Sequence, residues 1–392
     1  MFKSVLSLTL AAALGTASFG QTTLTAVPGE AASAKYASIS QEILRAIEKG
    51  NEYLKTRQNP EGYWAQPSYP ALTALAVTAY MRDPANQGKP LPEYIRKGYD
   101  FILKSQKEDG SIFNRGMSSY NTAVCMMALL AANKEEYAPA ILKGRAYLIK
   151  QQNHFAPDNP YNGGIGYGDK QAPPIADLSN TSLALEAIYY SQKLAKDGKY
   201  GEQPDLDWNA ATEFINRCQQ NPAVNKEPWV SNDKSQIGGF VCRPGVSSAR
   251  DKKAAAFDKA EPPKAYGSMT YAGMQSLIYA NVDKNDPRVK LALKWLENSY
   301  SLDENPGMGV QGLYYYYQAM SKALSAMGID TLTLENGRKV DWRDELAHKL
   351  ISIQKSDGSW VNTNNRWWEA DPVLVTSYCV LALEQLYHSI PR

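Results

Sequence analysis

Apolar and polar residues follow one another along the chain in two kinds of helical segment. In Ile43–Thr56, apolar side chains recur at helical spacing and charged residues occupy the opposite side, which is typical of a helix with one exposed face. Five further segments share this amphipathic pattern: Pro92–Ser105, Ala138–Lys150, Asn209–Cys218, Arg288–Ser299 and Trp342–Ile353. These segments are predicted to form helices that each keep one side in water.

Segments of the second kind carry almost no charge. Ala71–Met81 reads Ala-Leu-Thr-Ala-Leu-Ala-Val-Thr-Ala-Tyr-Met, and a helix that is apolar on all sides is covered on all sides. Five similar segments each follow one of the amphipathic helices: Thr122–Ala132, Thr181–Tyr190, Tyr271–Ala280, Leu313–Met327 and Val373–Leu386. The alternation predicts an all-α fold of about six helix pairs in two concentric layers.

A short sequence recurs between the two members of each pair. In its clearest copy, Gln354–Trp360, a glutamine is followed by Lys-Ser, the turn sequence Asp-Gly, and then Ser-Trp. The glycine supplies the positive φ with which many helices end, and the large residue after it can anchor the turn between helices. Less regular copies are at Gln58–Trp64, Gln106–Ile112, Gln152–Ile165, Gln220–Phe240 and Asp303–Met308.

The copy at Gln354 resembles the Q-W repeat of the prenyltransferase and squalene-cyclase superfamily, and the resemblance extends from about Ala46 to the C-terminus. It implies an α/α toroid, an inner and an outer ring of helices, like that of terpenoid cyclases and protein prenyltransferases. The end repeats are as apolar as the middle ones, which favours a closed ring over an open solenoid with polar ends. Residues 41–392 are expected to form this domain.

The N-terminus has the pattern of a secretory signal. Lys3 supplies positive charge, Val5–Leu14 is apolar, and cleavage is expected before Gln21. We expect residues 1–20 to be removed, residues 21–40 to be a flexible lead-in, and the mature protein to be periplasmic or secreted. No later apolar run reaches the roughly 18 residues that a membrane span requires.

The net charge bears on the choice of partner, and the four cysteines bear on a possible disulfide. A formal net charge of +2 over 392 residues gives no reason to expect a nucleic-acid partner. Cys218 and Cys242 flank the fourth turn and are a candidate disulfide in an oxidising compartment, and the sequence does not decide whether it forms. Cys125 and Cys379 lie in apolar helices and are expected to be buried thiols.

Candidate binding residues follow from the toroid geometry. The N-terminal ends of the inner helices would meet at one mouth of the cavity, where their free N–H groups also point. A cavity wall rich in aromatic side chains would suit an isoprenoid, another hydrophobic molecule, a sugar ring or a cation. The residues at these ends are rich in tyrosine and tryptophan: Tyr120, Asn180, Tyr266, Ser268, Tyr271, Gln311, Tyr314, Tyr317, Trp367 and Trp368.

Catalytic carboxylates are harder to find. Triterpene cyclases resembling this chain carry Asp-x-Asp-Asp-Thr at the start of an inner helix, where the middle aspartate protonates the substrate. The matching segment, Asp177–Thr181, has Ser179 in that place, and a serine hydroxyl is too weak an acid to protonate an alkene. Asp177 and Glu369 remain weak catalytic candidates, whereas Asp371 is explained as a helix cap.

No metal and no cofactor is expected. Protein prenyltransferases hold zinc with an aspartate, a cysteine and a histidine. The histidines of this chain lie apart, His154 in a turn, His348 on an outer helix and His388 at the tail, which does not suit a zinc site.

Three functions stay open. The first is an exported squalene/terpenoid-cyclase-like repeat protein that binds or modifies an isoprenoid or other hydrophobic ligand in an aromatic cavity, whether or not it is an enzyme. The second is a carbohydrate-active hydrolase or lyase, which needs two placed carboxylates such as Glu369 with Asp177 or Asp371. The third is a non-catalytic scaffold that binds a protein partner through its ring surface and the Gly245–Pro263 loop.

Overall fold

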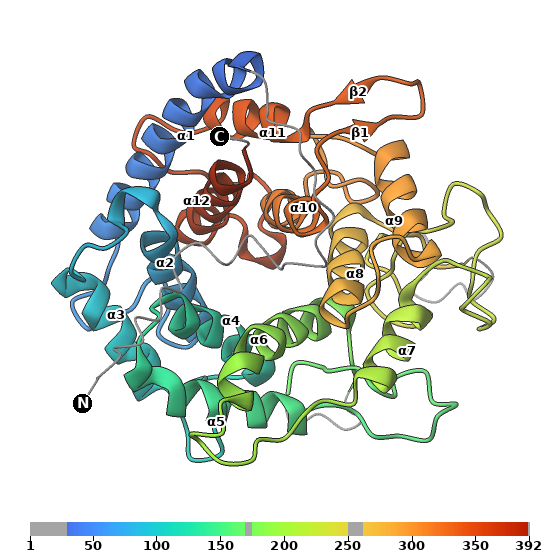
Figure 1. The fold of residues 1–392 in the computed structure, drawn as a ribbon, viewed down its shortest axis with the longest axis horizontal. Coiled ribbons are helices and arrows are strands. Elements are labelled where there is room, and N and C mark those ends of the chain that lie inside the picture. The colour runs from blue at the N-terminus through green and yellow to red at the C-terminus, as the bar shows by residue number, and fades with distance from the viewer. Residues whose placement is uncertain (1–29, 169–174, 250–261, 391–392) are drawn as a thin grey trace, which may run out of the picture.

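The computed structural model describes residues 30–168, 175–249 and 262–390, and these form two concentric rings of helices (Figure 1). The outer ring consists of α1 (Glu30–Thr56), α3 (Glu93–Lys104), α5 (Ala138–Lys150), α7 (Trp208–Cys218), α9 (Pro287–Asn298) and α11 (Trp342–Ser352). The inner ring consists of α2 (Pro70–Arg82), α4 (Ser118–Ala131), α6 (Leu178–Lys196), α8 (Gly267–Tyr279), α10 (Leu313–Met327) and α12 (Pro372–Ser389). The predicted all-α toroid is confirmed.

The inner ring is closed. Each inner helix packs against the next one along the chain, and α12 packs against α2. The outer helix α1 also lies against α11 and α12, so segments from both ends of the chain meet (Figure 1). Because the two ends cover each other, neither end repeat needs the polar outer face that an open solenoid requires.

The repeated turn links three helices through one glutamine. Gln354 Nε2 donates a hydrogen bond to the carbonyl of Gly358 in its own turn and another to the carbonyl of Ala46 in α1, both at 3.0 Å. Four further glutamines bond in the same way to their own turn and to a carbonyl in or just before the next outer helix: Gln58, Gln106, Gln152 and Gln219.

The inner helix holds the turn from the other side. The backbone N–H of Trp360 donates to Thr376 Oγ1 in α12 at 3.1 Å, and the Trp360 indole donates to Leu350 O in α11 at 2.8 Å. A threonine on the inner helix accepts the corresponding N–H in four other repeats: Thr73, Thr122, Thr181 and Thr270. The turn thus joins an outer helix, its inner partner and the next outer helix.

Two copies of the repeat differ from their prediction. In the fourth copy the linking glutamine is Gln219 and not Gln220, whose side chain instead bonds to Ser231 N and Pro263 O. In the fifth copy Asn305 takes the place of a glutamine and accepts a hydrogen bond from Ser268 N in α8, at 2.9 Å. That copy therefore links back to the preceding inner helix.

Some other expectations meet the structure only in part. Helix α1 begins at Glu30 and so includes the second half of the stretch 21–40, while residues 1–29 lie outside the described residues. Most of the Gly245–Pro263 loop also lies outside them. A short hairpin that was not predicted, β1 (Leu332–Thr333) and β2 (Lys339–Val340), precedes α11. Within the described ranges no helix has the length and apolar character to cross a membrane.

The close approach of the last turn to α1 gives a first prediction. Gly358 has φ +87°, and a Cβ there would lie 2.3 Å from the Lys49 carbonyl oxygen, whereas Gly337 has φ +81° with open space around it. We expect Gly337→Ala to lower the free energy of unfolding by about 1 kcal/mol, the cost of a left-handed alanine, and Gly358→Ala to lower it by about 3 kcal/mol or more. Urea unfolding of both variants measures this. Equal losses would show that the contact with α1 does not hold the ring closed.

Candidate ligand-binding cavity

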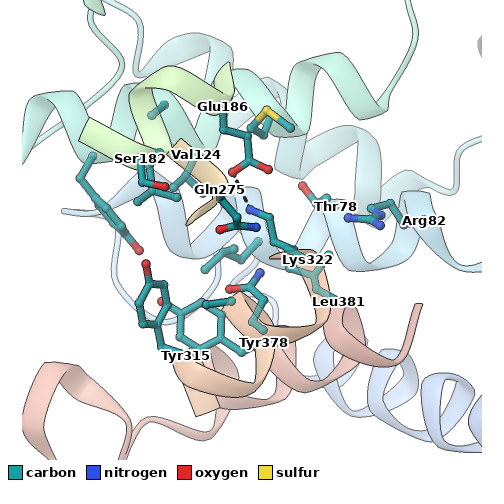
Figure 2. Close-up of a pocket in the computed structure, with 17 residues that line it drawn as sticks. Thr78, Arg82, Val124, Ser182, Glu186, Gln275, Tyr315, Lys322, Tyr378 and Leu381 are labelled. Atoms are coloured by element: carbon teal, nitrogen blue, oxygen red, sulfur yellow. Dashed lines mark hydrogen bonds and ion pairs between the residues drawn. The ribbon is translucent and has the colours of Figure 1, made fainter. Parts of the chain in front are cut away.

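A cavity lies inside the inner ring, and all six inner helices contribute to its wall (Figure 2). The cavity has a volume of about 80 Å³. Its apolar wall consists of Leu75, Ala123, Val124, Met127, Leu183, Ala319 and Leu381. Its polar lining consists of Thr78, Arg82, Tyr120, Ser182, Glu186, Gln275, Tyr315, Gln318, Lys322 and Tyr378.

The polar lining is divided between two depths. Tyr120 and Tyr315 each lie two residues after the start of their helices, whereas Glu186, Gln275 and Lys322 lie eight or nine residues after it. At a rise of 1.5 Å per residue this places the second group about 10 Å deeper. The inner helices all run in one direction, so the cavity has a tyrosine end and a charged end with an apolar wall between them.

The tyrosine end is aromatic and shielded from water. Burial raises the pKa of Tyr315 to about 12, and it also raises the pKa values of Tyr120 and Tyr378. The rings of Tyr315 and Tyr378 lie 6.0 Å apart at their centroids. At neutral pH these are neutral phenols, which offer ring surfaces and hydroxyl groups to a ligand.

The charged end centres on an ion pair. Lys322 Nζ donates to Glu186 Oε2 at 2.5 Å, across from α10 to α6 (Figure 2). Glu186 is 6% exposed. The pKa of the neighbouring Tyr279 is raised mainly by burial and in addition by the Glu186 carboxylate. Such a pair is held in low dielectric, where removal of one partner leaves an uncompensated charge.

Two further polar side chains at this end, Gln275 and Arg82, make no hydrogen bond to a carboxylate of the cavity wall. Gln275 is 5% exposed, and its Nε2 has no hydrogen-bond partner in the structure. Arg82 donates to the neutral Gln385 Oε1 at 2.7 Å. Glu384 is near Arg82 but fully buried, and burial raises its pKa well above the ordinary range, with Arg82 opposing the rise only in part.

Four consecutive tyrosines, Tyr314–Tyr317, lie at the start of α10, and the one that lines the cavity differs from the two that were predicted. Tyr315 lines the cavity, whereas the hydroxyl of Tyr314 donates to Val361 O and that of Tyr317 to Leu302 O. Tyr314 and Tyr317 are buried and pack edge to face, with centroids 5.7 Å apart. Of the predicted binding residues, Tyr120 is the one that the structure places in the cavity wall.

Asp177 and Asn180 lie together at the start of α6. Asp177 accepts hydrogen bonds from Asn180 N at 2.9 Å and from Asn180 Nδ2 at 2.7 Å, so its carboxylate caps the helix. Burial nevertheless raises the pKa of Asp177 to about 6, against the lowering effect of Asn180 and Arg243. Ser179, in the place of the cyclase acid, lies beside the Tyr315 hydroxyl.

Glu369 is used as a helix cap. Its Oε1 accepts from Tyr315 N at 2.8 Å and its Oε2 from Tyr314 N at 3.4 Å, at the start of α10. Asn362 Nδ2 donates to Oε2 as well, at 2.7 Å. Glu369 is 1% exposed and does not belong to the cavity wall. Asp371 accepts from Val373 N and caps α12, as the sequence predicted.

Trp367 and Trp368 lie on the surface, 45% and 39% exposed, and both have positive φ. Trp368 stacks on Tyr69 with centroids 4.6 Å apart, and the guanidinium of Arg366 lies 4.5 Å from the centroid of Trp367. Gln311 accepts a hydrogen bond from that same arginine. These residues form part of the outer rim and not of the central cavity.

The predicted residues of α8 pack in the wall of the ring. Tyr266, Ser268 and Tyr271 are buried; Ser268 Oγ accepts from Asn305 Nδ2, and Tyr271 packs against Tyr316. All four cysteines are free thiols, and Cys125, Cys218 and Cys379 are buried. Across the described ranges no group of three or more histidine, cysteine, aspartate or glutamate residues is placed to hold a metal ion.

Sequence reasoning missed the charged end of the cavity. Glu186 and Lys322 are isolated charges inside otherwise apolar helices, and Gln275 is an isolated amide in a third. A charge in a helix that is covered on every side must face a partner or a cavity. That signal was present in the sequence and would have identified both members of the ion pair.

No family model matches the chain. Among solved structures, the fold is similar to the type II terpene cyclase MstE from Scytonema, with a TM-score of 0.53 and 11% sequence identity over 89% of this chain and 99% of that one. It is also similar to Candida albicans protein geranylgeranyltransferase-I, with a TM-score of 0.55 and 14% identity over 87% and 91% of the two chains. At these identities the likeness establishes the terpene cyclase and prenyltransferase type of fold.

The buried ion pair gives the second prediction. We expect Lys322→Met to lower the free energy of unfolding by about 3 kcal/mol, because Glu186 is left charged and unpaired in the cavity wall. The double variant Glu186→Gln/Lys322→Met removes both charges and should recover most of that loss. Guanidinium unfolding of both variants measures the difference. A double variant that is as unstable as Lys322→Met would show that packing, and not the unpaired charge, causes the loss.

The raised pKa of Asp177 gives the third prediction. Since its folded-state pKa of about 6 lies above the ordinary aspartate value of 3.8, the group favours folding below about pH 4, and this contribution is lost as the pH rises through 6. Asp177→Asn keeps a capping side chain and cannot titrate. Relative to that variant, the wild type should lose about 2 kcal/mol of unfolding free energy between pH 4 and pH 7. Urea unfolding at four pH values tests this, and a constant difference would contradict it.

Proposed function

We propose that this chain is an exported, terpene-cyclase-like repeat protein that binds the apolar body of an isoprenoid or other hydrophobic molecule in its central cavity. The observation that supports this most directly is a cavity walled by all six inner helices, apolar along its middle and aromatic at one end. Export is part of the proposal because of the signal pattern at Lys3 and Val5–Leu14.

The structural neighbours support the choice of ligand class. One MstE structure is in complex with geranylgeranyl dihydroxybenzoate, described as its substrate, and the geranylgeranyltransferase is in complex with GGPP. Both proteins thus hold long isoprenoid chains in the fold that this chain shares. We carry over the class of ligand only, because the identities of 10% and 14% are too low to transfer a reaction.

The chemistry of the wall favours binding without cyclisation. Of the seventeen lining residues, Glu186 is the one carboxylate, and it is paired with Lys322. The Lys322 ammonium occupies this carboxylate, so the wall offers no free acid group that faces a bound alkene. Ser179 does not supply that proton either. The proposal is therefore a binding protein, and conversion of a bound isoprenoid to a cyclic product would contradict this part of it.

A carbohydrate-active function loses its main support. That hypothesis depended on a free carboxylate pair including Glu369. The oxygens of Glu369 are occupied by backbone N–H groups of α10 and by Asn362, and Asp177 and Asp371 cap their own helices. Each of these carboxylates already has a structural role.

The fourth prediction concerns occupancy of the cavity. Mature protein purified gently from its own cell envelope should carry a bound mass in the isoprenoid range by native mass spectrometry. Met127→Trp, which fills the cavity with an indole, should lose it, with affinity for added geranylgeraniol reduced about tenfold or more. Leu130→Trp, on the same helix and outside the cavity wall, is the matched control.

Circular dichroism and thermal unfolding establish that both variants are folded before the comparison. Retention of the ligand by Met127→Trp would place binding elsewhere on the protein. If the wild type carries no ligand and binds neither an isoprenoid alcohol nor an isoprenoid acid, the proposed function is wrong.

A further inference from the structure

We infer that the charged end of the cavity, defined by Arg82, Glu186, Gln275 and Lys322, holds the head group of an amphiphile, and that this head group is a carboxylate. The inference rests on the proposed function and adds a ligand class to it: an isoprenoid or similar hydrocarbon chain that ends in a carboxylic acid. The chain lies against the apolar wall and the acid group reaches the charged end.

The first argument is an unused donor. Gln275 is 95% buried, its Nε2 has no partner, and its side chain points into the cavity beside Lys322 and Glu186 (Figure 2). A buried amide N–H without an acceptor is costly, and folded proteins satisfy nearly all such groups. An acceptor oxygen on a bound molecule would satisfy this one. Lys322 Nζ carries three N–H groups, of which one goes to Glu186.

The second argument is charge. The lining contains the cations Arg82 and Lys322 and the single anion Glu186. Lys322 neutralises Glu186 directly, which leaves one positive charge in excess at this end. Glu384 interacts with Arg82, but burial raises the pKa of its carboxyl well above the ordinary range, which weakens it as a counter-charge. A monoanionic head group balances the excess, because one negative charge meets one unneutralised cation.

The third argument is the distribution of polarity along the cavity. The tyrosine end and the apolar middle offer no cation, since the lysine and the arginine of the wall both lie toward the C-terminal ends of their helices. Arg82 lies in the last turn of α2, where a helix C-terminus favours a cation, and Lys322 is held by its ion pair with Glu186. A molecule that is apolar along its body and anionic at one end matches this order, and a hydrocarbon without a head group leaves Gln275 unsatisfied.

The experiment compares two probes that differ only in the head group, geranylgeranoic acid and geranylgeraniol. Each is titrated into the mature protein at pH 7.5 by isothermal calorimetry, below the concentration at which the acid forms micelles. We expect the acid to bind about tenfold more tightly, the ratio that charge-assisted hydrogen bonds to a carboxylate provide. Equal affinities would overturn the carboxylate inference and leave the proposed function standing, whereas binding of neither probe would count against the proposed function itself.

Variants of the charged end test whether the preference for the acid over the alcohol arises there. Gln275→Leu keeps the size of the side chain and removes the donor, and it should bring the acid-to-alcohol ratio down to about twofold. Glu186→Gln/Lys322→Met keeps the cavity wall neutral and removes the ammonium, and it should lower the ratio as well. Gln41→Leu, on the exposed side of α1, is the matched control. An acid preference that survives both cavity variants would place the head group elsewhere and overturn the inference.

Discussion

One hydrogen-bonded turn determines the architecture of this protein. A glutamine at the end of an outer helix bonds to its own turn and to a backbone carbonyl of the neighbouring repeat, while a threonine on the inner helix holds the residue after the turn. Because five of the six turns join three helices in this way, the angle between successive pairs is set locally and the sixth pair meets the first. The bond from Gln354 to the Ala46 carbonyl closes the ring between segments 308 residues apart.

Ring closure creates the conditions for a polar site inside the protein. Six inner helices in one direction bring residues of equal depth into one layer, so single residues from α6, α8 and α10 meet although they are far apart in sequence. The Glu186–Lys322 pair needs both rigid helices to hold its geometry, since a buried pair is stable only when its partners stay in place. The cavity chemistry therefore depends on the glutamine turns that hold these helices in place.

The fold was predictable from the sequence because its helix pair and turn are repeated. Most of the site was not predictable, because each of its residues occurs in only one repeat. Apolar inner helices and glycine-containing turns recur in several copies, so an error such as Gln220 for Gln219 leaves the architecture unchanged. The choice among the tyrosines of α10 depends on a helical phase of 100° per residue, which places Tyr315 in the cavity and turns Tyr314 and Tyr317 into the layer between the rings. Glu369 looked free because the backbone that it caps begins more than fifty residues earlier.

The carboxylates Glu186 and Glu384 lie in different surroundings, one within the cavity wall and one outside it. An acid that protonates a hydrocarbon must be uncharged until it reacts, and burial favours the uncharged form. Burial raises the pKa of Glu384 in this way, although Arg82 opposes the rise, and Glu384 lies outside the cavity wall. The carboxylate within the wall, Glu186, is engaged by Lys322 in an ion pair. The Lys322 ammonium and the Gln275 amide both line the cavity at this end. We propose that this charged end holds the polar group of a ligand while the apolar wall covers the rest of it.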